Sequence, residues 1–193
     1  MIRLERYAQA LGAALTAAQV TDSSGKAVDS SEAIQFIIES LNETRDLGGK
    51  NIFIGNGGSA AIASHMAIDY SKNGRLPSQA FNDGASLTCL GNDLGYENVF
   101  AEQIKLFAKP LDQLFAISSS GASPNILEAV NEARSLGCRV VTLSGFKPDN
   151  PLRSKGDLNW YVNSREYGFV EISHLTICHA ILDYQMGWNG DLP

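Results

Sequence analysis

The spacing of apolar residues along the chain changes near residue 50. Before that point they recur every three or four residues, which predicts two amphipathic helices, over residues 2–19 and 30–47. The polar stretch 21–29 interrupts the helical pattern between them. A helix pair that precedes the first strand has no place in a strand–helix alternation. Its apolar faces must cover either a partner subunit or their own domain, and the pattern leaves both open.

From Asn51 onward, short apolar runs alternate with helical patterns. The expected strands cover residues 51–54, 78–81, 113–118, 139–144 and 158–162. The expected helices cover residues 60–72, 97–108, 124–136 and 170–186. This alternation predicts an α/β fold with a mostly parallel sheet covered on both faces. Ligands of such folds bind at the carboxyl ends of the strands.

A glycine-rich turn follows the first expected strand. Residues 55–59, Gly-Asn-Gly-Gly-Ser, are called the glycine loop below, and they lead directly into an alanine-rich helical run. The glycines permit backbone angles that other residues avoid, and Ser59 occupies the expected N-cap of the helix. Unpaired N–H groups and the helix dipole make such a helix start an anion site. A strand-to-helix turn without a ligand is the alternative.

A serine-rich turn follows the third expected strand. Residues 118–123, Ser-Ser-Ser-Gly-Ala-Ser, are called the serine loop below. Ser123 is the expected N-cap of the next helix, because Pro124 suits the first helical position. Hydroxyls and free N–H groups at a helix start form a neutral cradle for a phosphate dianion. A solvated turn is the alternative, but two such loops on one sheet favour phosphate binding.

A third turn is expected over residues 91–96, where two glycines flank Asn92 and Asp93. Turn chemistry alone accounts for these residues. The position of the turn in the chain would also let Asp93 reach a substrate hydroxyl.

Composition narrows the function further. The 193 residues are 44% apolar and 19% charged, with a net charge of −6, as in a globular protein. No basic face for nucleic acid is expected, so a phosphate ligand must be held locally by loops. The cysteines, Cys89, Cys138 and Cys178, lack the spacing of a disulfide framework or a zinc ribbon.

The chain also lacks a signal peptide pattern and an apolar run of membrane-spanning length, so neither a membrane nor secretion is expected and the cytoplasm is the default location. No linker divides the sequence. We expect one domain over residues 1–193, with the helix pair in 1–48 and the α/β core in 49–193.

The three histidines fall in two expected helices. His65 and Asp69 are four residues apart, so they share a helix face and could bind one metal ion. Glu171 and His179 are eight residues apart, a rise of about 12 Å, which is long for two ligands of one ion. Imidazole and carboxylate ligands together suit zinc or a similar divalent ion. Core or surface histidines without a metal are the alternative.

Four segments resemble one protein family. FIGNGGS, GASLTCLGND, SSSGAS and VEISHLTICH, in this order, are similar to segments of the SIS (sugar isomerase) phosphosugar-binding domain family. The last helix points to its phosphoheptose isomerase branch. The resemblance runs from about Gly49 to the end, and the two leading helices fit the N-terminal pair of that family.

The resemblance implies a three-layer, flavodoxin-like sandwich with a five-stranded parallel sheet, which forms a homotetramer with active sites at the subunit interfaces. It implies isomerisation of sedoheptulose 7-phosphate to a manno-heptose 7-phosphate, which supplies heptose for surface polysaccharides. Asp69 and His179 would act as base and acid through an enediol, with a divalent ion, zinc by preference, polarising the carbonyl.

The resemblance also assigns the binding residues. The implied substrate-binding residues are Asn56, Gly57, Gly58, Ser59, Asn92, Asp93, Ser118, Ser119, Ser120, Ser123 and Glu171. The implied metal ligands are His65, Asp69, Glu171 and His179.

The chain departs from the family pattern at several positions. Asp69 stands where the family has glutamate, which shortens the carboxylate by one methylene. Glu171 stands where the family has glutamine and adds a negative charge, and Gly168 replaces an aspartate. The paired histidine and acid that follow the glycine loop in the family are absent, because residues 60–62 are Ala-Ala-Ile.

These departures keep three functions open. The first is a metal-assisted phosphosugar isomerase, which His65, Glu171 and His179 favour. The second is a non-catalytic SIS protein that binds a protein partner, as one relative binds a bacterial replication initiator, and Asp69 favours it. The third is an isomerase of another sugar phosphate, which fits Gly168 and the altered acids.

Overall fold

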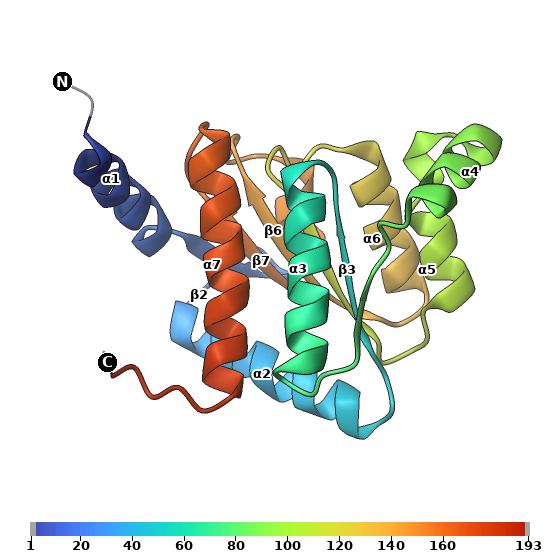
Figure 1. Cartoon of the computed structure of the whole chain (residues 1–193), viewed down its shortest axis with the longest axis horizontal. Helices are drawn as coiled ribbons and strands as arrows, with labels where there is room; N and C mark the ends of the chain where they lie inside the picture. The colour runs from blue at the N-terminus through green and yellow to red at the C-terminus, as the bar shows by residue number, and fades with distance from the viewer. Residues whose placement is uncertain (1–2, 192–193) are drawn as a thin grey trace.

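A seven-stranded sheet forms the centre of the computed structural model, which describes residues 3–191 (Figure 1). Five strands are parallel, as the sequence predicts: β3 Asn51–Gly55, β4 Ser78–Ala80, β5 Gln113–Ser118, β6 Arg139–Gly145 and β7 Leu158–Val162. Their spatial order is β7-β6-β5-β3-β4, the flavodoxin-like order. The direction of chain progression therefore reverses between β3 and β5, the point at which such sheets bind ligands.

Two further strands extend the sheet beyond the five that the sequence predicts. β1 Gln19–Asp22 pairs antiparallel with β7, and β2 Ala27–Val28 pairs with β1. The sequence does not predict these two strands, so the sheet has seven strands rather than five. The strands are too short to show a period-2 pattern, and the hairpin depends on its turn. There the Asp22 carboxylate accepts hydrogen bonds from the backbone N–H of Ser24 (2.8 Å) and of Lys26 (3.0 Å).

Helices cover both faces of the sheet. One layer contains α2 Ser30–Asp46, α3 Gly58–Lys72 and α7 Tyr167–Gln185; the other contains α5 Ala101–Phe107 and α6 Pro124–Ser135 (Figure 1). Successive residues of β3 point to opposite faces, so Phe53 packs in the core beneath α3 and α7, whereas Ile52 and Ile54 pack beneath α5 and α6. This three-layer arrangement confirms the predicted fold class.

The segment before α5 differs from its prediction. Residues 84–94 form a helix, α4 Gly84–Leu94, and the predicted helix 97–108 divides into the short 3₁₀ helix η1 Tyr96–Asn98 and α5. A second short 3₁₀ helix, η2 Pro151–Ser154, precedes β7. The side chain of Asp83 caps α4 by accepting from the Ser86 N–H at 2.8 Å. Gly91 lies inside α4 because a single glycine only weakens a helix that is capped and packed elsewhere.

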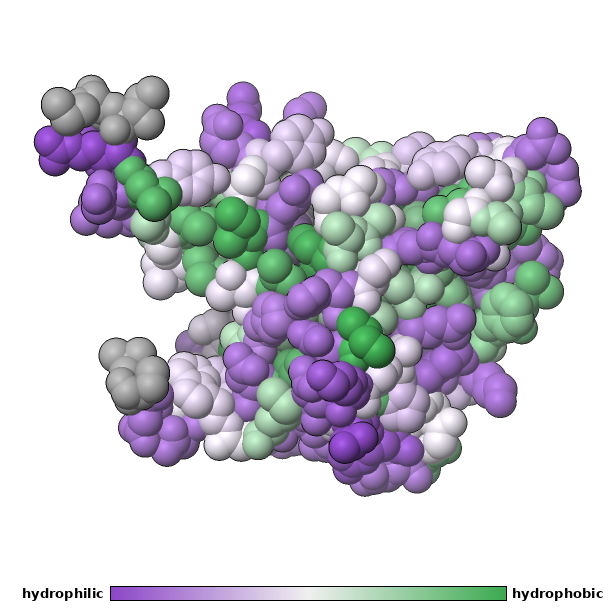
Figure 2. All heavy atoms as spheres, viewed as in Figure 1, coloured by the Kyte–Doolittle hydropathy of each residue, from purple (hydrophilic) through white to green (hydrophobic). Residues whose placement is uncertain are grey.

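The two leading helices have different surroundings. α2 buries Ala33, Ile37 and Leu41 against its own domain. α1 Leu4–Thr16 buries none of its residues, and Leu4 remains 78% exposed. Figure 2 shows hydrophobic side chains gathered where α1 lies beside α7. α2 therefore packs on its own chain, the second of the two alternatives. The apolar face of α1 is covered in part: Ala14 and Leu15 pack against the core, whereas Leu4 stays exposed.

No helix within residues 3–191 is both long and apolar enough to cross a bilayer. Cys138 and Cys178 are buried, as expected of core residues, and burial raises the pKa of their thiols to about 11 and about 12. Cys89 is exposed.

Candidate functional site

A cavity of about 240 Å³ opens at the carboxyl ends of β3 and β5, where the strand order reverses. It is lined by Asn56, Gly57, Gly58, Ser59, Ser118, Ser119, Ser120, Ser123, Tyr167 and Glu171. All of these except Tyr167 are among the substrate-binding residues that the sequence predicts. The structure thus brings the glycine loop and the serine loop together in one cavity, whose lining contains no lysine or arginine.

The glycine loop depends on two of its glycines. A Cβ atom on Gly55 would lie 2.5 Å from the backbone of Ser59, so only glycine permits the chain to turn this closely. Gly57 has φ +55°, a region that favours glycine, and it is the N-cap of α3. The prediction of Ser59 as the N-cap is therefore wrong. Because α3 begins at Gly58, Ser59 lies in its first turn, where its side chain is buried beside the cavity.

The serine loop has the predicted helix start. Ser123 is the N-cap of α6 and Pro124 occupies the first turn, while the Ser123 side chain makes no capping hydrogen bond. Gly121 has φ +60°, and a Cβ atom there would lie 1.9 Å from Asn150 Oδ1. This packing against Asn150 holds the loop in place, so that its hydroxyls remain on the cavity side.

Hydroxyls with unused hydrogen-bonding capacity line the serine loop. The Ser119 hydroxyl is buried and has no hydrogen-bond partner in residues 3–191. The hydroxyls of Ser118 and Ser123 are 3.4 Å apart, at the limit of a hydrogen bond. Buried polar groups usually have partners, so an unpartnered hydroxyl at the wall of a cavity indicates a ligand atom. Together with the start of α6, these groups can bind a phosphate without a cationic side chain.

Glu171 lies at the cavity, near the first residue of α3. A Cβ atom on Gly58 would lie 2.4 Å from Glu171 Oε2, so glycine at position 58 leaves room for this carboxylate. A negative charge beside a helix N-terminus is favourable. The neighbouring departure, Gly168, also has a structural counterpart, because the Tyr7 hydroxyl of α1 lies 2.5 Å from the position of a Cβ there. A larger residue at position 168 would displace Tyr7.

Asn92 and Asp93, which were expected to bind the substrate, lie away from the cavity. Both are exposed residues of α4 rather than of a turn, and neither lines the cavity. Asp93 instead accepts a hydrogen bond from the Asn92 side chain at 2.8 Å. The helix that carries them was not expected, because two nearby glycines favoured a loop in the sequence.

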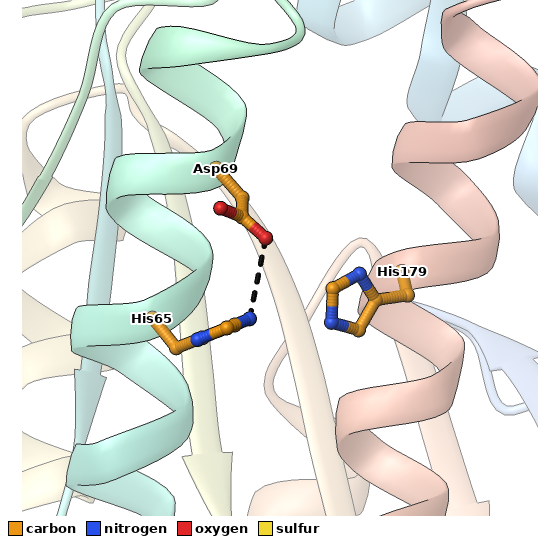
Figure 3. Close-up of side chains that lie close together, drawn as sticks. All are labelled: His65, Asp69 and His179. Carbon is orange, nitrogen blue, oxygen red and sulfur yellow. Dashed lines mark ion pairs between the residues drawn. The ribbon is translucent and has the colours of Figure 1, made fainter.

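A second group of site residues lies between α3 and α7 (Figure 3). His65 and Asp69 project from α3 toward His179 on α7, and potential ligand atoms of the three lie within 4.8 Å of one another. We call this group the His–Asp–His cluster. His65 Nε2 lies 3.2 Å from Asp69 Oδ2, and the two imidazole rings have centroids 5.3 Å apart. The side chain of His65 is 54% exposed and that of Asp69 is 23% exposed.

The fourth predicted metal ligand is not part of this cluster. Glu171 lines the cavity instead, since it precedes His179 on α7 by about two turns, roughly 12 Å. The structure therefore groups three of the four residues and places the fourth at the cavity.

The remaining histidine, His174, is fully buried in α7. Its Nε2 atom lies 3.1 Å from the carbonyl oxygen of Ser144, at the end of β6. Burial lowers the pKa of His174 to about 4, so the imidazole is neutral and donates to this carbonyl. His174 thus anchors α7 to the sheet beside the strand that precedes the serine loop.

Comparison with known proteins agrees with this geometry. The SIS domain family model matches residues 17–145. A phosphoheptose isomerase of Trichlorobacter lovleyi is 35% identical over 153 residues, which cover 76% of this chain and 78% of the relative. A phosphoheptose isomerase of Campylobacter concisus is 36% identical over 159 residues, covering 77% of this chain and 84% of the relative.

Solved structures extend the similarity to the whole fold. A phosphoheptose isomerase from Francisella tularensis has a TM-score of 0.75 at 25% identity and covers 97% of this chain and 100% of that one. One from Neisseria gonorrhoeae has a TM-score of 0.71 at 29% identity, with 81% and 84% covered. The chain therefore belongs to the SIS domain family, and within that family its relatives are phosphoheptose isomerases.

Proposed function

We propose that this chain is a phosphosugar aldose–ketose isomerase that converts sedoheptulose 7-phosphate to D-glycero-D-manno-heptose 7-phosphate. The observation that carries the proposal is the presence of two complementary groups on one chain. The cavity offers hydroxyls and a helix start to a phosphate, while the His–Asp–His cluster offers groups that can transfer a proton. A pure binding protein needs only the first.

The separation of the two groups supports a long sugar. His65 follows Gly58 by seven residues and His179 follows Glu171 by eight, so the cluster lies about 10 to 12 Å along the helices from the cavity. An extended seven-carbon chain measures about 8 Å from C1 to C7, taking roughly 1.3 Å of advance for each C–C bond of 1.5 Å. With its phosphate added, it spans a distance of this size, whereas a triose phosphate does not.

The cluster fits a divalent metal ion. Two imidazoles and one carboxylate are the three protein ligands of many catalytic zinc sites, which keep a further position open. We propose that His65, Asp69 and His179 hold such an ion, zinc by preference. When bound, the ion would polarise the substrate carbonyl.

Asp69 and His179 would carry out the proton transfer. In the proposed reaction, the Asp69 carboxylate removes the proton from the carbon next to the carbonyl, and His179 exchanges the proton of the oxygen, so that an enediol forms and is reprotonated on the other carbon. His65 Nε2 lies 3.2 Å from Asp69 Oδ2, close enough for both atoms to bind the same ion. Glu171 would accept a hydrogen bond from a sugar hydroxyl at the edge of the cavity.

The proposal includes an assembly of several copies, a tetramer by resemblance. Its support is that α1 contains no fully buried residue and leaves the apolar side chain of Leu4 exposed. The product would supply heptose for surface polysaccharides from the cytoplasm. Multi-angle light scattering of the purified chain tests the assembly, and a monomer would contradict it.

Deuterium exchange tests the reaction itself. We expect sedoheptulose 7-phosphate incubated with the protein in heavy water to gain one deuterium and to yield the aldose, as mass spectrometry and NMR would show. A panel of shorter ketose phosphates should react more slowly. Binding of sugar phosphate without any exchange would contradict the enzyme and leave the non-catalytic SIS protein, which the shortened Asp69 favours.

A further inference from the structure

Two asparagine side chains connect the glycine loop to the start of α6. Asn56 of the glycine loop donates to Asn125 Oδ1 at 2.9 Å, and Asn125 donates back to Asn56 Oδ1 at 2.9 Å. The residues are 69 positions apart in sequence. Asn125 belongs to the first turn of α6 and is 2% exposed, so it does not line the cavity, whereas Asn56 does.

A third side chain completes the arrangement. The hydroxyl of Tyr96, in η1, donates to Asn56 Oδ1 at 3.2 Å. The Oδ1 atom has two lone pairs, and both now have donors. The Nδ2 atom has two N–H groups, of which Asn125 uses one. The orientation of the Asn56 amide is thus determined, and one N–H group is its remaining hydrogen-bonding capacity at the cavity.

We propose that Asn125 and Tyr96 are positioning residues that hold Asn56 so that its free N–H donates to an oxygen atom of the bound sugar. This inference rests on the proposed function, because it takes a sugar phosphate as the ligand. A donor that is held in advance binds an acceptor without losing side-chain entropy at that moment. Neither positioning residue lines the cavity, so each would act through Asn56.

A double-mutant cycle tests the proposal. The affinities of Asn56→Ala, Asn125→Ala and the double variant for sedoheptulose 7-phosphate and for inorganic phosphate are measured by calorimetry. One lost hydrogen bond corresponds to a loss of about tenfold in sugar-phosphate affinity for either single variant. The double variant should lose little more than Asn56→Ala alone, since Asn125 acts through Asn56. Affinity for inorganic phosphate, which the serine loop binds, should remain within about twofold.

Steady-state kinetics distinguish a positioning role from a purely structural one. Whichever of KM and kcat Asn56→Ala changes, Asn125→Ala should change the same one. Asn131→Ala, on an exposed turn of the same helix, is the matched control and should resemble the wild type. Tyr96→Phe, which removes one exposed hydroxyl without a risk to folding, should reduce sugar-phosphate affinity about threefold and add nothing in the Asn56→Ala background.

The outcomes separate this inference from the proposed function. A wild type that binds sedoheptulose 7-phosphate but does not isomerise it contradicts the proposed function, while the binding cycle still decides the role of Asn125. Unchanged sugar-phosphate affinity in Asn125→Ala and Tyr96→Phe overturns the positioning role. If the affinity losses of Asn56→Ala and Asn125→Ala are strictly additive, the positioning role is also overturned. An equal loss of affinity for inorganic phosphate overturns it too, because Asn125 would then maintain the shape of the serine loop instead.

Discussion

The cavity and the His–Asp–His cluster differ in how the chain builds them. The cavity is formed by two loops whose course is set by glycine geometry and by buried hydroxyls. The cluster consists of side chains on the facing sides of two helices, and His65 is more than half exposed. The turn of a glycine-rich loop does not depend on side chains of neighbouring helices, whereas the cluster changes with a single methylene, as at Asp69. The departure at Glu171 instead places a carboxylate at the cavity.

The largest expected effect separates turnover from binding. We expect His179→Ala to lower kcat by about 10²- to 10⁴-fold, the usual contribution of a general acid or base. Affinity for inorganic phosphate should not change, because His179 does not line the cavity. Steady-state kinetics and calorimetry provide the two measurements. Asp183→Ala, an exposed residue one turn further along α7, is the control. Parallel losses of turnover and phosphate affinity would mean that the two sites are not independent.

The buried histidine of the same helix should affect stability rather than chemistry. The pKa of His174 is about 4 in the folded chain against 6.5 for an ordinary histidine, so below pH 6.5 the unfolded chain binds more protons. Above pH 6.5 the protonation of His174 therefore does not affect the free energy of unfolding. As the pH falls from 6.5 to 4, this free energy decreases by about 3 kcal/mol. Urea denaturation across this range should show that loss in the wild type, but not in His174→Gln, in which an amide can donate to the Ser144 carbonyl. Identical pH profiles would contradict burial of a neutral imidazole.

A smaller effect should appear when one hydroxyl is removed from the serine loop. Ser123→Ala should weaken binding of inorganic phosphate by about 10- to 100-fold, as expected for a hydrogen bond to a charged group. Its melting temperature should change little, because the Ser123 side chain makes no capping hydrogen bond. Ser135→Ala, at the opposite end of α6, is the matched control. Unaltered phosphate affinity in Ser123→Ala would place the phosphate elsewhere.

The smallest expected effect is a gain. Asp69→Glu restores the longer carboxylate of the family, moving it by about 1 Å toward the substrate, and should raise kcat about tenfold. KM should stay nearly constant, since the phosphate is bound by the loops. Single-turnover kinetics would separate the chemical step from product release. No change in rate would show that Asp69 is not the base.

Local patterns account for the parts that the sequence predicts well. The parallel strands and the helices after both loops follow from short-range periodicity, and the serine loop follows from Pro124 after its N-cap. The hairpin of β1 and β2 was missed because its strands are short. α4 was missed because glycines at positions 91 and 95 obscured a helix whose cap, Asp83, lies eight residues before the first of them. These errors concern segments in which local signals conflict or are weak.

By itself the sequence determined that this protein is an α/β domain with a glycine-rich and a serine-rich loop at helix starts, because each of those features is encoded within about ten consecutive residues. Only the tertiary structure decided that both loops share one cavity, that Glu171 lines this cavity, and that Asn125 pairs with Asn56 across 69 residues. These relations depend on strand order and on how α7 packs beside the two loops, and the local pattern of the sequence encodes neither.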